Sequence, residues 1–211
     1  MKSNTSPMHP ESYYHIYNRG INGEQIFKEE RNYSYFLQQY AKYIEPIAIT
    51  FAYVLMGNHF HFLIQIKSAD EIRENLPTQF GKSVEIIIGQ QFAKLFNGYA
   101  QAINRQEKRT GGLFEETFRR IPVENIFYAA QVVYYIHFNP QKHKLFVSDF
   151  KNYAHSSYYA FLQKGLTRIP REQVFEWFGG KDKFLTYHGE DHDVEFENHF
   201  IQNNWIEFDE I

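Results

Sequence analysis

Two histidines separated by one residue, His59 and His61, form the first candidate site in the sequence. They fall in a stretch that predicts a β-strand, where alternate side chains point to the same face, so both imidazoles could approach one metal ion. Phe60 and Phe62 would occupy the opposite face and anchor the strand in a hydrophobic core. Two histidines can also decorate a half-buried strand without binding any ion, so the pair alone leaves both interpretations open.

A second group of candidate residues lies near the C-terminal end of a predicted helix. Tyr135 and Asn139 are four residues apart and share a helix face, whereas Tyr134 lies about 100° further round. A tyrosine hydroxyl titrates near ~10 in model peptides, so it is a poor nucleophile at neutral pH unless a metal ion or a base activates it. The amide oxygen of Asn139 could complete a metal site begun by two histidines. In a chain with 16 tyrosines these side chains could equally fill the core.

The elements that position these residues follow from hydrophobic periodicity. Strands are predicted at 12–18, 47–56, 59–67 and 114–123, and helices at 29–44, 82–106 and 125–138. Gly57-Asn58 predicts a tight antiparallel hairpin, and Asn139-Pro140 is expected to end the last helix. The buried side of the helix at 82–106 is expected to carry Ile86, Phe92, Phe96 and Ala100.

This order of elements predicts an α+β fold in which an antiparallel or mixed sheet is packed by helices on one face. Residues 1–163 are expected to form the main domain, and 164–211 a small helical appendage with an acidic tail. Neither internal repeats nor low-complexity tracts interrupt this organisation.

Composition and charge limit the function classes. The net charge is −3, but residues 181–211 alone carry nine carboxylates against two lysines, which leaves the rest of the chain at +4. A mildly basic body permits a nucleic-acid partner without requiring one. The chain has no cysteine, no signal-peptide pattern at its start and no apolar run near the ~20 residues of a membrane helix, so we expect a soluble, cytoplasmic protein.

The two candidate groups belong to longer motifs, YVLMGNHFHFLIQ (53–65) and YYIHFNPQKHKLF (134–146). Three further segments accompany them in order: YHIYNRGINGEQIF near the start, GGLFEETFRRIPV between the two motifs and AHSSYYAF after them. Over roughly residues 12–162 the chain thus resembles the single-tyrosine HUH transposases of the insertion-sequence-200-like class. Within that class it is most similar to the branch associated with repetitive extragenic palindromes.

The resemblance implies a ferredoxin-like HUH palm and a role for each candidate residue. His59 and His61 match the pair that binds a divalent ion, Mg²⁺ or Mn²⁺, and Tyr135 matches the nucleophile. Asn139 occupies the position of a third metal ligand, which is glutamine in some relatives. The implied activity is cleavage and rejoining of single-stranded or hairpin DNA through a 5′-phosphotyrosine. The palindrome-associated branch implies a monomer, and the insertion-sequence members imply a homodimer.

Basic residues that flank these motifs are candidate phosphate contacts, although each taken alone is an ordinary solvated charge. They are Arg19, Arg105, Lys108, Arg109, Arg119, Arg120, Lys142 and Lys144.

The remaining histidines have other interpretations. His15 could approach the site from the first strand, but a core or surface role is favoured. His137 is expected to point away from Tyr135, and the last group is expected in a solvated acidic tail: His188, His192 and His199.

Two other functions stay open on the sequence. The first is a DNA-binding protein of the same fold that recognises palindromic elements and does not use its chemistry. The second is an unrelated metal hydrolase built from His59, His61 and a carboxylate, whose activity would not depend on Tyr135. Cleavage of hairpin DNA, and its loss on replacing Tyr135, would separate the three.

Overall fold

The computed structural model describes residues 7–115, 117–142 and 147–190, and a four-stranded sheet forms the centre of this part of the chain. The strands are β1 (Tyr13–Arg19), β2 (Ala48–Met56), β3 (His59–Ile66) and β4 (Arg119–Val123). They lie in the order β2-β3-β1-β4, and each neighbouring pair is antiparallel. The predicted α+β class with an antiparallel sheet is confirmed.

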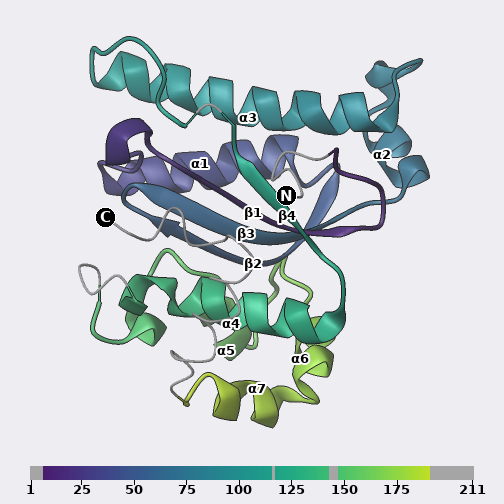
Figure 1. Ribbon diagram of the computed structural model, residues 1–211, viewed down its shortest axis with the longest axis vertical. Helices are drawn as coiled ribbons and strands as arrows, with labels where there is room; N and C mark the ends of the chain where they lie inside the picture. The colour runs from purple at the N-terminus through teal and green to yellow at the C-terminus, as the bar shows by residue number, and fades with distance from the viewer. Residues whose placement is uncertain (1–6, 116, 143–146, 191–211) are drawn as a thin grey trace.

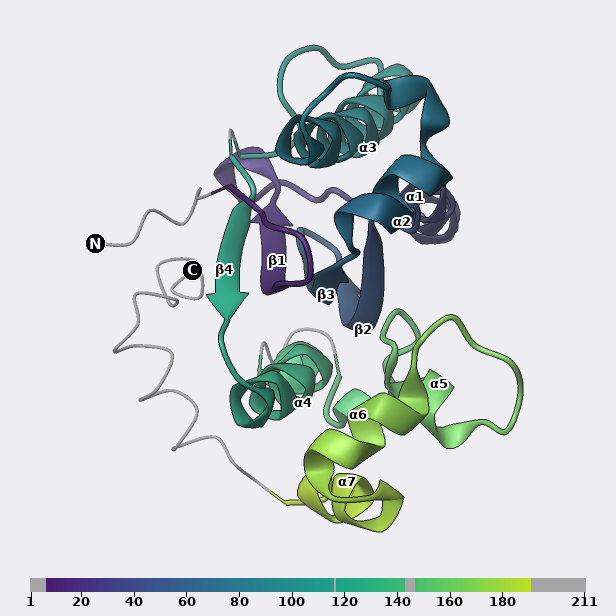
Figure 2. The ribbon, with the colours of Figure 1, turned by 90° about the vertical axis from the view of Figure 1, so that its right-hand side faces the viewer.

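The helices form two layers, one on each face of the sheet (Figures 1 and 2). One face carries α1 (Glu30–Tyr43), α2 (Ala69–Asn75) and α3 (Val84–Gln106). The other carries α4 (Ile126–Lys142), α5 (Tyr158–Leu162), α6 (Arg171–Phe178) and α7 (Lys181–Tyr187). Short 3-10 turns lie at Ile21–Gly23, Pro77–Gln79 and Phe150–Asn152. The prediction of helices on one face was therefore wrong, because the central strands are apolar on both sides.

Alternation along β3 explains why there are two cores. Phe60, Phe62 and Ile64 join a buried cluster with α1 and α3. Leu63 points to the other face and joins a second cluster, which includes Val54 of β2 and much of α4. His61 lies two residues from Leu63 and therefore shares the face covered by α4.

Most predicted elements are present, and the differences have local causes. The strand predicted at 114–123 begins only at Arg119, with Phe114 forming an isolated bridge to Gly20. Helix α4 continues through Asn139 and Pro140 to Lys142 instead of ending there. A proline in the last turn removes one backbone donor, and the helix continues around it at limited cost. Helix α2 was not predicted, although Ser68 and Glu71 form a capping box at its start.

Helix α3 is the longest helix and is only partly buried. Ile86 was predicted on its buried side but is 52% exposed. Ile87 and Ile88 are buried in its place, because the run of three isoleucines is wider than the stripe that faces the sheet. Across the described residues, no helix combines the length and the apolar character that crossing a membrane requires.

Helices α6 and α7 of the predicted appendage pack against α4. Val174 and Phe175 of α6 and Phe184 of α7 are buried in the same cluster as Tyr134 of α4. The second core therefore runs without interruption from the sheet through α4 to α7. The acidic residues from 191 onwards lie outside the described residues.

We expect Phe62→Ala to lower the free energy of unfolding by about 3–5 kcal/mol. The ring is 1% exposed and stacks on Tyr40 with centroids 4.4 Å apart, so truncation leaves a cavity that the sheet cannot easily close. Urea denaturation would measure the loss. Phe80→Ala is the matched control, because Phe80 is 96% exposed and its removal should change stability by less than about 0.5 kcal/mol. Equal losses in the two variants would contradict the assignment of the core.

Candidate functional site

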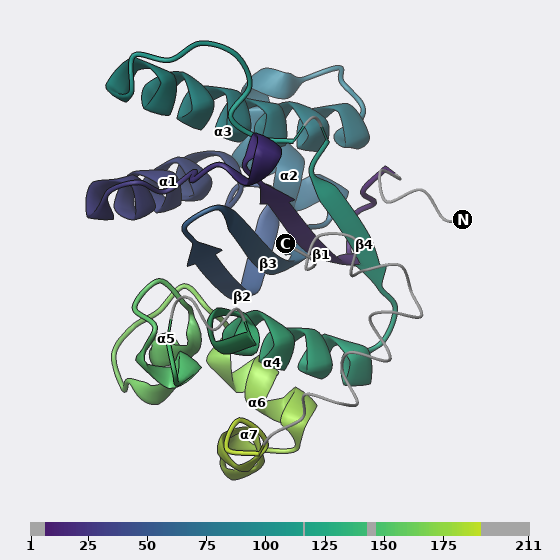
Figure 3. The same ribbon diagram turned by 60° about the vertical axis from the view of Figure 1, so that its left-hand side comes forward.

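The candidate residues of the sequence meet in the layer between the sheet and α4. In the antiparallel register of β1 and β3, Tyr17 lies opposite His61 and Arg19 lies opposite His59. Helix α4 runs across this face of the sheet (Figure 3) and contacts β2 and β3. It brings Tyr135 and Asn139 to the two histidines, so residues far apart in sequence form one site.

His59 has a contact at each ring nitrogen. Its Nδ1 lies 2.7 Å from Oδ1 of Asn58, which can only accept, so Nδ1 donates and Nε2 carries the lone pair of the neutral ring. Nε2 in turn lies 3.4 Å from Oδ1 of the fully buried Asn139. Two acceptors that face each other at this distance suit a cation between them, since metal–ligand bonds of about 2.1 Å give a similar ligand separation.

The amide of Asn139 is incompletely satisfied by the protein. Within the described residues, its buried Nδ2 makes no hydrogen bond, and its Oδ1 faces only the ring nitrogen of His59. Buried polar atoms without partners are rare in folded proteins and often mark functional positions. The Asn139 side chain therefore makes few hydrogen bonds within the protein, as expected of a side chain that binds a metal ion.

His61 is oriented by two residues of β1. Its Nδ1 lies 2.9 Å from Nε2 of His15, and its ring stacks against His15 and Tyr17 with centroids 5.1 and 5.4 Å apart. His15 is 1% exposed, which fits the favoured interpretation of a core histidine, and it also approaches the site through its contact with His61. The alternation Tyr13-x-His15-x-Tyr17 was the signal that could have placed it on this face.

These contacts fit a divalent ion at the two histidines. Histidines that bind metals commonly donate their other ring N–H to a neighbour, which fixes the ring and its tautomer. Both Nδ1 atoms have such a neighbour, Asn58 and His15, so Nε2 of each ring would bind the ion. In the described ranges no three His, Asp or Glu side chains form a group suited to a metal ion. The candidate donors are thus two imidazoles and the Asn139 amide, and the hydrolase interpretation lacks its carboxylate there.

Tyr135 presents its ring to both histidines. The ring packs edge-on against His61 and His15, with centroids 5.6 and 5.8 Å away, and only 7% of the residue is exposed. Nζ of Lys142, one helical turn beyond Asn139, lies 5.6 Å from the centre of the ring. This is a cation–π contact, so Lys142 brings positive charge against the ring of Tyr135.

Tyr134 faces away from this site, as the helix spacing predicted. It is 1% exposed, its hydroxyl donates to the carbonyl of Glu190 at 3.2 Å, and its ring stacks on Phe138. It therefore joins α4 to the end of α7 and belongs to the second core.

His137 and His188 form a buried pair on the far side of α4. Nδ1 of His137 is 3.0 Å from Nε2 of His188, and Nε2 of His137 is 2.9 Å from Oγ of Ser157. His137 points away from Tyr135, as expected. His188 is 1% exposed, so its prediction in a solvated tail was wrong, because α7 turns back onto α4 and buries it. His192 and His199 lie outside the described residues.

Acidification should destabilise the protein through this pair. Burial, and to a lesser extent His188, lower the pKa of His137 well below its ordinary value of 6.5. Below that value the unfolded chain binds a proton that the folded chain does not, so stability falls as the pH decreases towards the folded pKa. One such group costs at most about 1.4 kcal/mol per pH unit. Urea denaturation of the wild type and of His137→Gln between pH 7.5 and 5.5 would measure how the free energy of unfolding depends on pH. The same pH dependence in both proteins would contradict the assignment of this effect to His137.

Three of the predicted basic residues lie beside the site. Arg19 and Arg119 belong to the sheet face covered by α4, since they lie opposite His59 and Tyr17 in their respective registers. Lys142 contacts the ring of Tyr135 from α4. These residues come from three separate elements, and each of them lies on the same side of the sheet as Tyr135.

The other predicted basic residues lie elsewhere. Arg120 faces the α3 side of the sheet over the ring of Phe118, and burial lowers its pKa. Arg109 pairs with Glu24 at 3.0 Å and donates to the carbonyl of Gly112, so it stabilises the loop after α3. Two more are exposed near the end of α3, across the sheet from Tyr135: Arg105 and Lys108. Lys144 lies outside the described residues.

Comparison with known proteins bears on the fold. No protein-family model matches the chain, and no curated protein matches its sequence. Among solved structures it is similar to that of a REP-associated tyrosine transposase bound to a REP hairpin, with a TM-score of 0.57 and 14% identity. The similarity covers 79% of this chain and 88% of the other. The chain therefore shares the fold of a structure solved with hairpin DNA.

Proposed function

We propose that this protein cleaves and rejoins single-stranded or hairpin DNA, with Tyr135 as the nucleophile. The proposal rests on one observation: the ring of Tyr135 packs edge-on against His61, next to the place where Nε2 of His59 faces Oδ1 of Asn139. The fold shared with a transposase bound to hairpin DNA supports the choice of substrate. The motifs of the single-tyrosine HUH transposases occupy the residues that form this site.

The reaction is an exchange of one phosphodiester for another. The hydroxyl oxygen of Tyr135 attacks the phosphorus, the bond from phosphorus to the 3′ oxygen of the preceding nucleotide breaks, and that oxygen takes up one proton. The products are a 5′-phosphotyrosine and a free 3′-hydroxyl, so the bond energy is conserved and rejoining needs no nucleotide cofactor. The low exposure of Tyr135 limits competition from water.

The chain's own residues have separate roles in this scheme. His59, His61 and Asn139 would hold Mg²⁺ or Mn²⁺, which supplies Lewis-acid polarisation of a phosphate oxygen when bound. Lys142 favours the developing negative charge beside the phenol. His15 keeps the His61 ring in its orientation.

The basic residues at the site would hold the DNA backbone. Arg19 of β1 and Arg119 of β4 lie on the sheet face that α4 covers, and Lys142 of α4 contacts the ring of Tyr135, so all three would contact phosphates near the scissile bond. Because such contacts release counterions, binding should weaken as the salt concentration rises.

Covalent capture tests the proposal directly. The full-length protein is incubated in Mn²⁺ with a library of hairpins that carry single-stranded flanks and a label on the 3′ side. We expect a labelled protein band that resists denaturant, with the nucleotide on the peptide that contains Tyr135. Binding without any adduct across the library would overturn the proposal and favour a DNA-binding protein that does not use its chemistry.

A further inference from the structure

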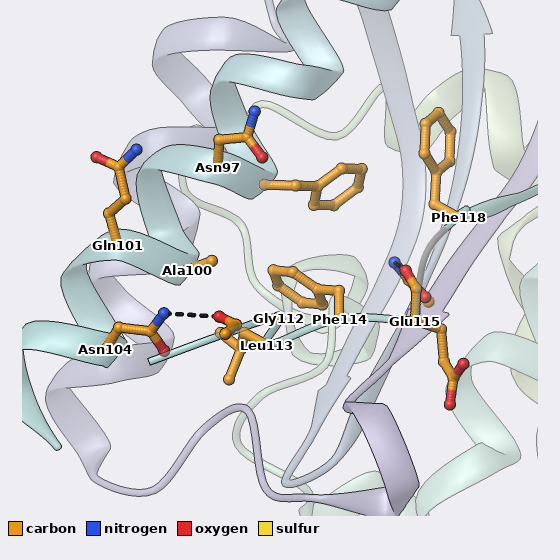
Figure 4. A pocket seen from close by; sticks show the side chains of 12 residues that line it. Asn97, Ala100, Gln101, Asn104, Gly112, Leu113, Phe114, Glu115 and Phe118 are labelled. Atoms are coloured by element: carbon orange, nitrogen blue, oxygen red, sulfur yellow. Dashed lines mark hydrogen bonds between the residues drawn. The ribbon is translucent and has the colours of Figure 1, made fainter. Parts of the chain in front are cut away.

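A cavity on the opposite face of the sheet remains outside this scheme (Figure 4). It lies between the C-terminal half of α3 and the segment that leads into β4, with a volume of about 320 Å³. This is within the range of about 300–1,000 Å³ that is usual for small-molecule sites. We call it the α3 cavity.

The lining of the α3 cavity combines side-chain amides with aromatic rings. Asn97, Gln101 and Asn104 lie along one side of α3, and Phe114 and Phe118 come from the segment opposite. Amides can donate to and accept from the edges of a base, and aromatic rings can stack on its face. Neutral, flat and polar-edged ligands therefore suit this cavity.

The charge of the lining argues against a phosphate as the occupant. Glu115 is the charged residue of the lining, and it would repel an anion. Asn104 lies deeper than the exposed Asn97 and Gln101, and its Nδ2 donates to the carbonyl of Gly111 at 2.9 Å. Among the described residues, the buried Oδ1 of Asn104 makes no hydrogen bond, so the protein leaves this amide partly unsatisfied.

The α3 cavity and the tyrosine site lie back to back at one end of the sheet. Asn18 of β1 lines the cavity, whereas the next residue, Arg19, belongs to the face of His59. Glu115 of the lining donates its backbone N–H to the carbonyl of Arg19 at 3.0 Å. A single strand of DNA whose scissile phosphate lies at Tyr135 could therefore pass the edge of the sheet at β4. One of its flanking bases would then reach the cavity.

We propose that the α3 cavity binds one unstacked nucleobase of the DNA, outside the cleaved step. The inference rests on the proposed function, because it takes the DNA substrate from it. The amides would select the base by its edge, and Phe114 and Phe118, which pack on Phe96 and Phe92, would form the apolar wall beside it. The cavity would thus contribute sequence selection, while the basic residues near Tyr135 contribute affinity for any sequence.

Photo-crosslinking locates the base. Hairpins carrying 5-iodouracil at successive flanking positions are bound to Tyr135→Phe protein, which holds DNA without cleaving it, and the crosslinked peptides are identified by mass spectrometry. We expect one flanking position to crosslink within 96–104 or 111–118. Crosslinks from all positions that map outside both segments would overturn the inference.

Matched variants test the selection. The double variant Asn97→Ala/Gln101→Ala should weaken binding of the preferred hairpin about fivefold or more and reduce discrimination at that one position. Gln38→Ala removes an exposed amide from α1 and should change neither. Unchanged discrimination in the double variant, or competition by free deoxynucleosides as effective as by hairpin DNA, would overturn the inference.

The two proposals fail separately. Crosslinks within the cavity, together with no covalent adduct in the wild type, would reject the tyrosine chemistry and keep the base site. An adduct on Tyr135 with no crosslink in the cavity would reject the base site alone.

Discussion

Tyr135→Phe is expected to abolish the covalent DNA adduct, with a loss of roughly 10³-fold or more in the rate of its formation. The substitution removes the one oxygen that forms the new bond and keeps the ring that packs against His61 and His15. Binding of hairpin DNA should therefore remain within about twofold, since the phosphate contacts come from other residues. Adduct yield on a denaturing gel and affinity by fluorescence anisotropy measure the two quantities.

Tyr134→Phe is the matched control for this experiment. It removes a hydroxyl of the same helix whose contact is the carbonyl of Glu190, and it should cost only about 1 kcal/mol of stability. The adduct should form at the wild-type rate. Persistence of the adduct in Tyr135→Phe, or its loss in Tyr134→Phe alone, would show that the nucleophile is assigned to the wrong residue.

The sequence predicted those parts of the site that depend on local geometry. Alternation on a strand placed His59 and His61 on one face, and a spacing of four placed Tyr135 and Asn139 on one helix face. Both periods are properties of the backbone, so they hold whatever the tertiary structure. The turn at Gly57-Asn58 was predictable for the same reason.

The parts that sequence could not supply depend on which elements become neighbours. His15 reaches His61 only because β1 pairs with β3, and nothing in either segment specifies that pairing. His188 is buried because α7 returns to α4, although its surroundings in sequence are acidic and polar. The separation of Arg119 and Arg120 is different, because strand alternation alone places such neighbours on opposite faces, and the prediction of both as phosphate contacts overlooked it.

Removing the two histidines should cost as much as removing the nucleophile. In His59→Ala/His61→Ala the amide of Asn139 is the remaining candidate ligand, so the affinity for Mn²⁺ should fall beyond measurement. Adduct formation should fall on the order of 10³-fold, because phosphate activation by the ion is lost. EDTA should reduce the wild type to the same level, and added Mn²⁺ should restore the wild type alone.

A readout without DNA separates loss of the ion from loss of the fold. Mn²⁺ at 100 times its Kd should raise the free energy of unfolding of the wild type by about 2.7 kcal/mol and leave the double variant unchanged. His155→Ala is the control, since His155 stacks on Tyr33 and pairs with Glu30 away from the site, and it should keep the full response. Equal stabilisation of wild type and double variant by Mn²⁺ would place the ion elsewhere. Tyr135 would then have no metal ion beside it at His61, and the proposed activation of the phosphate next to Tyr135 would fail.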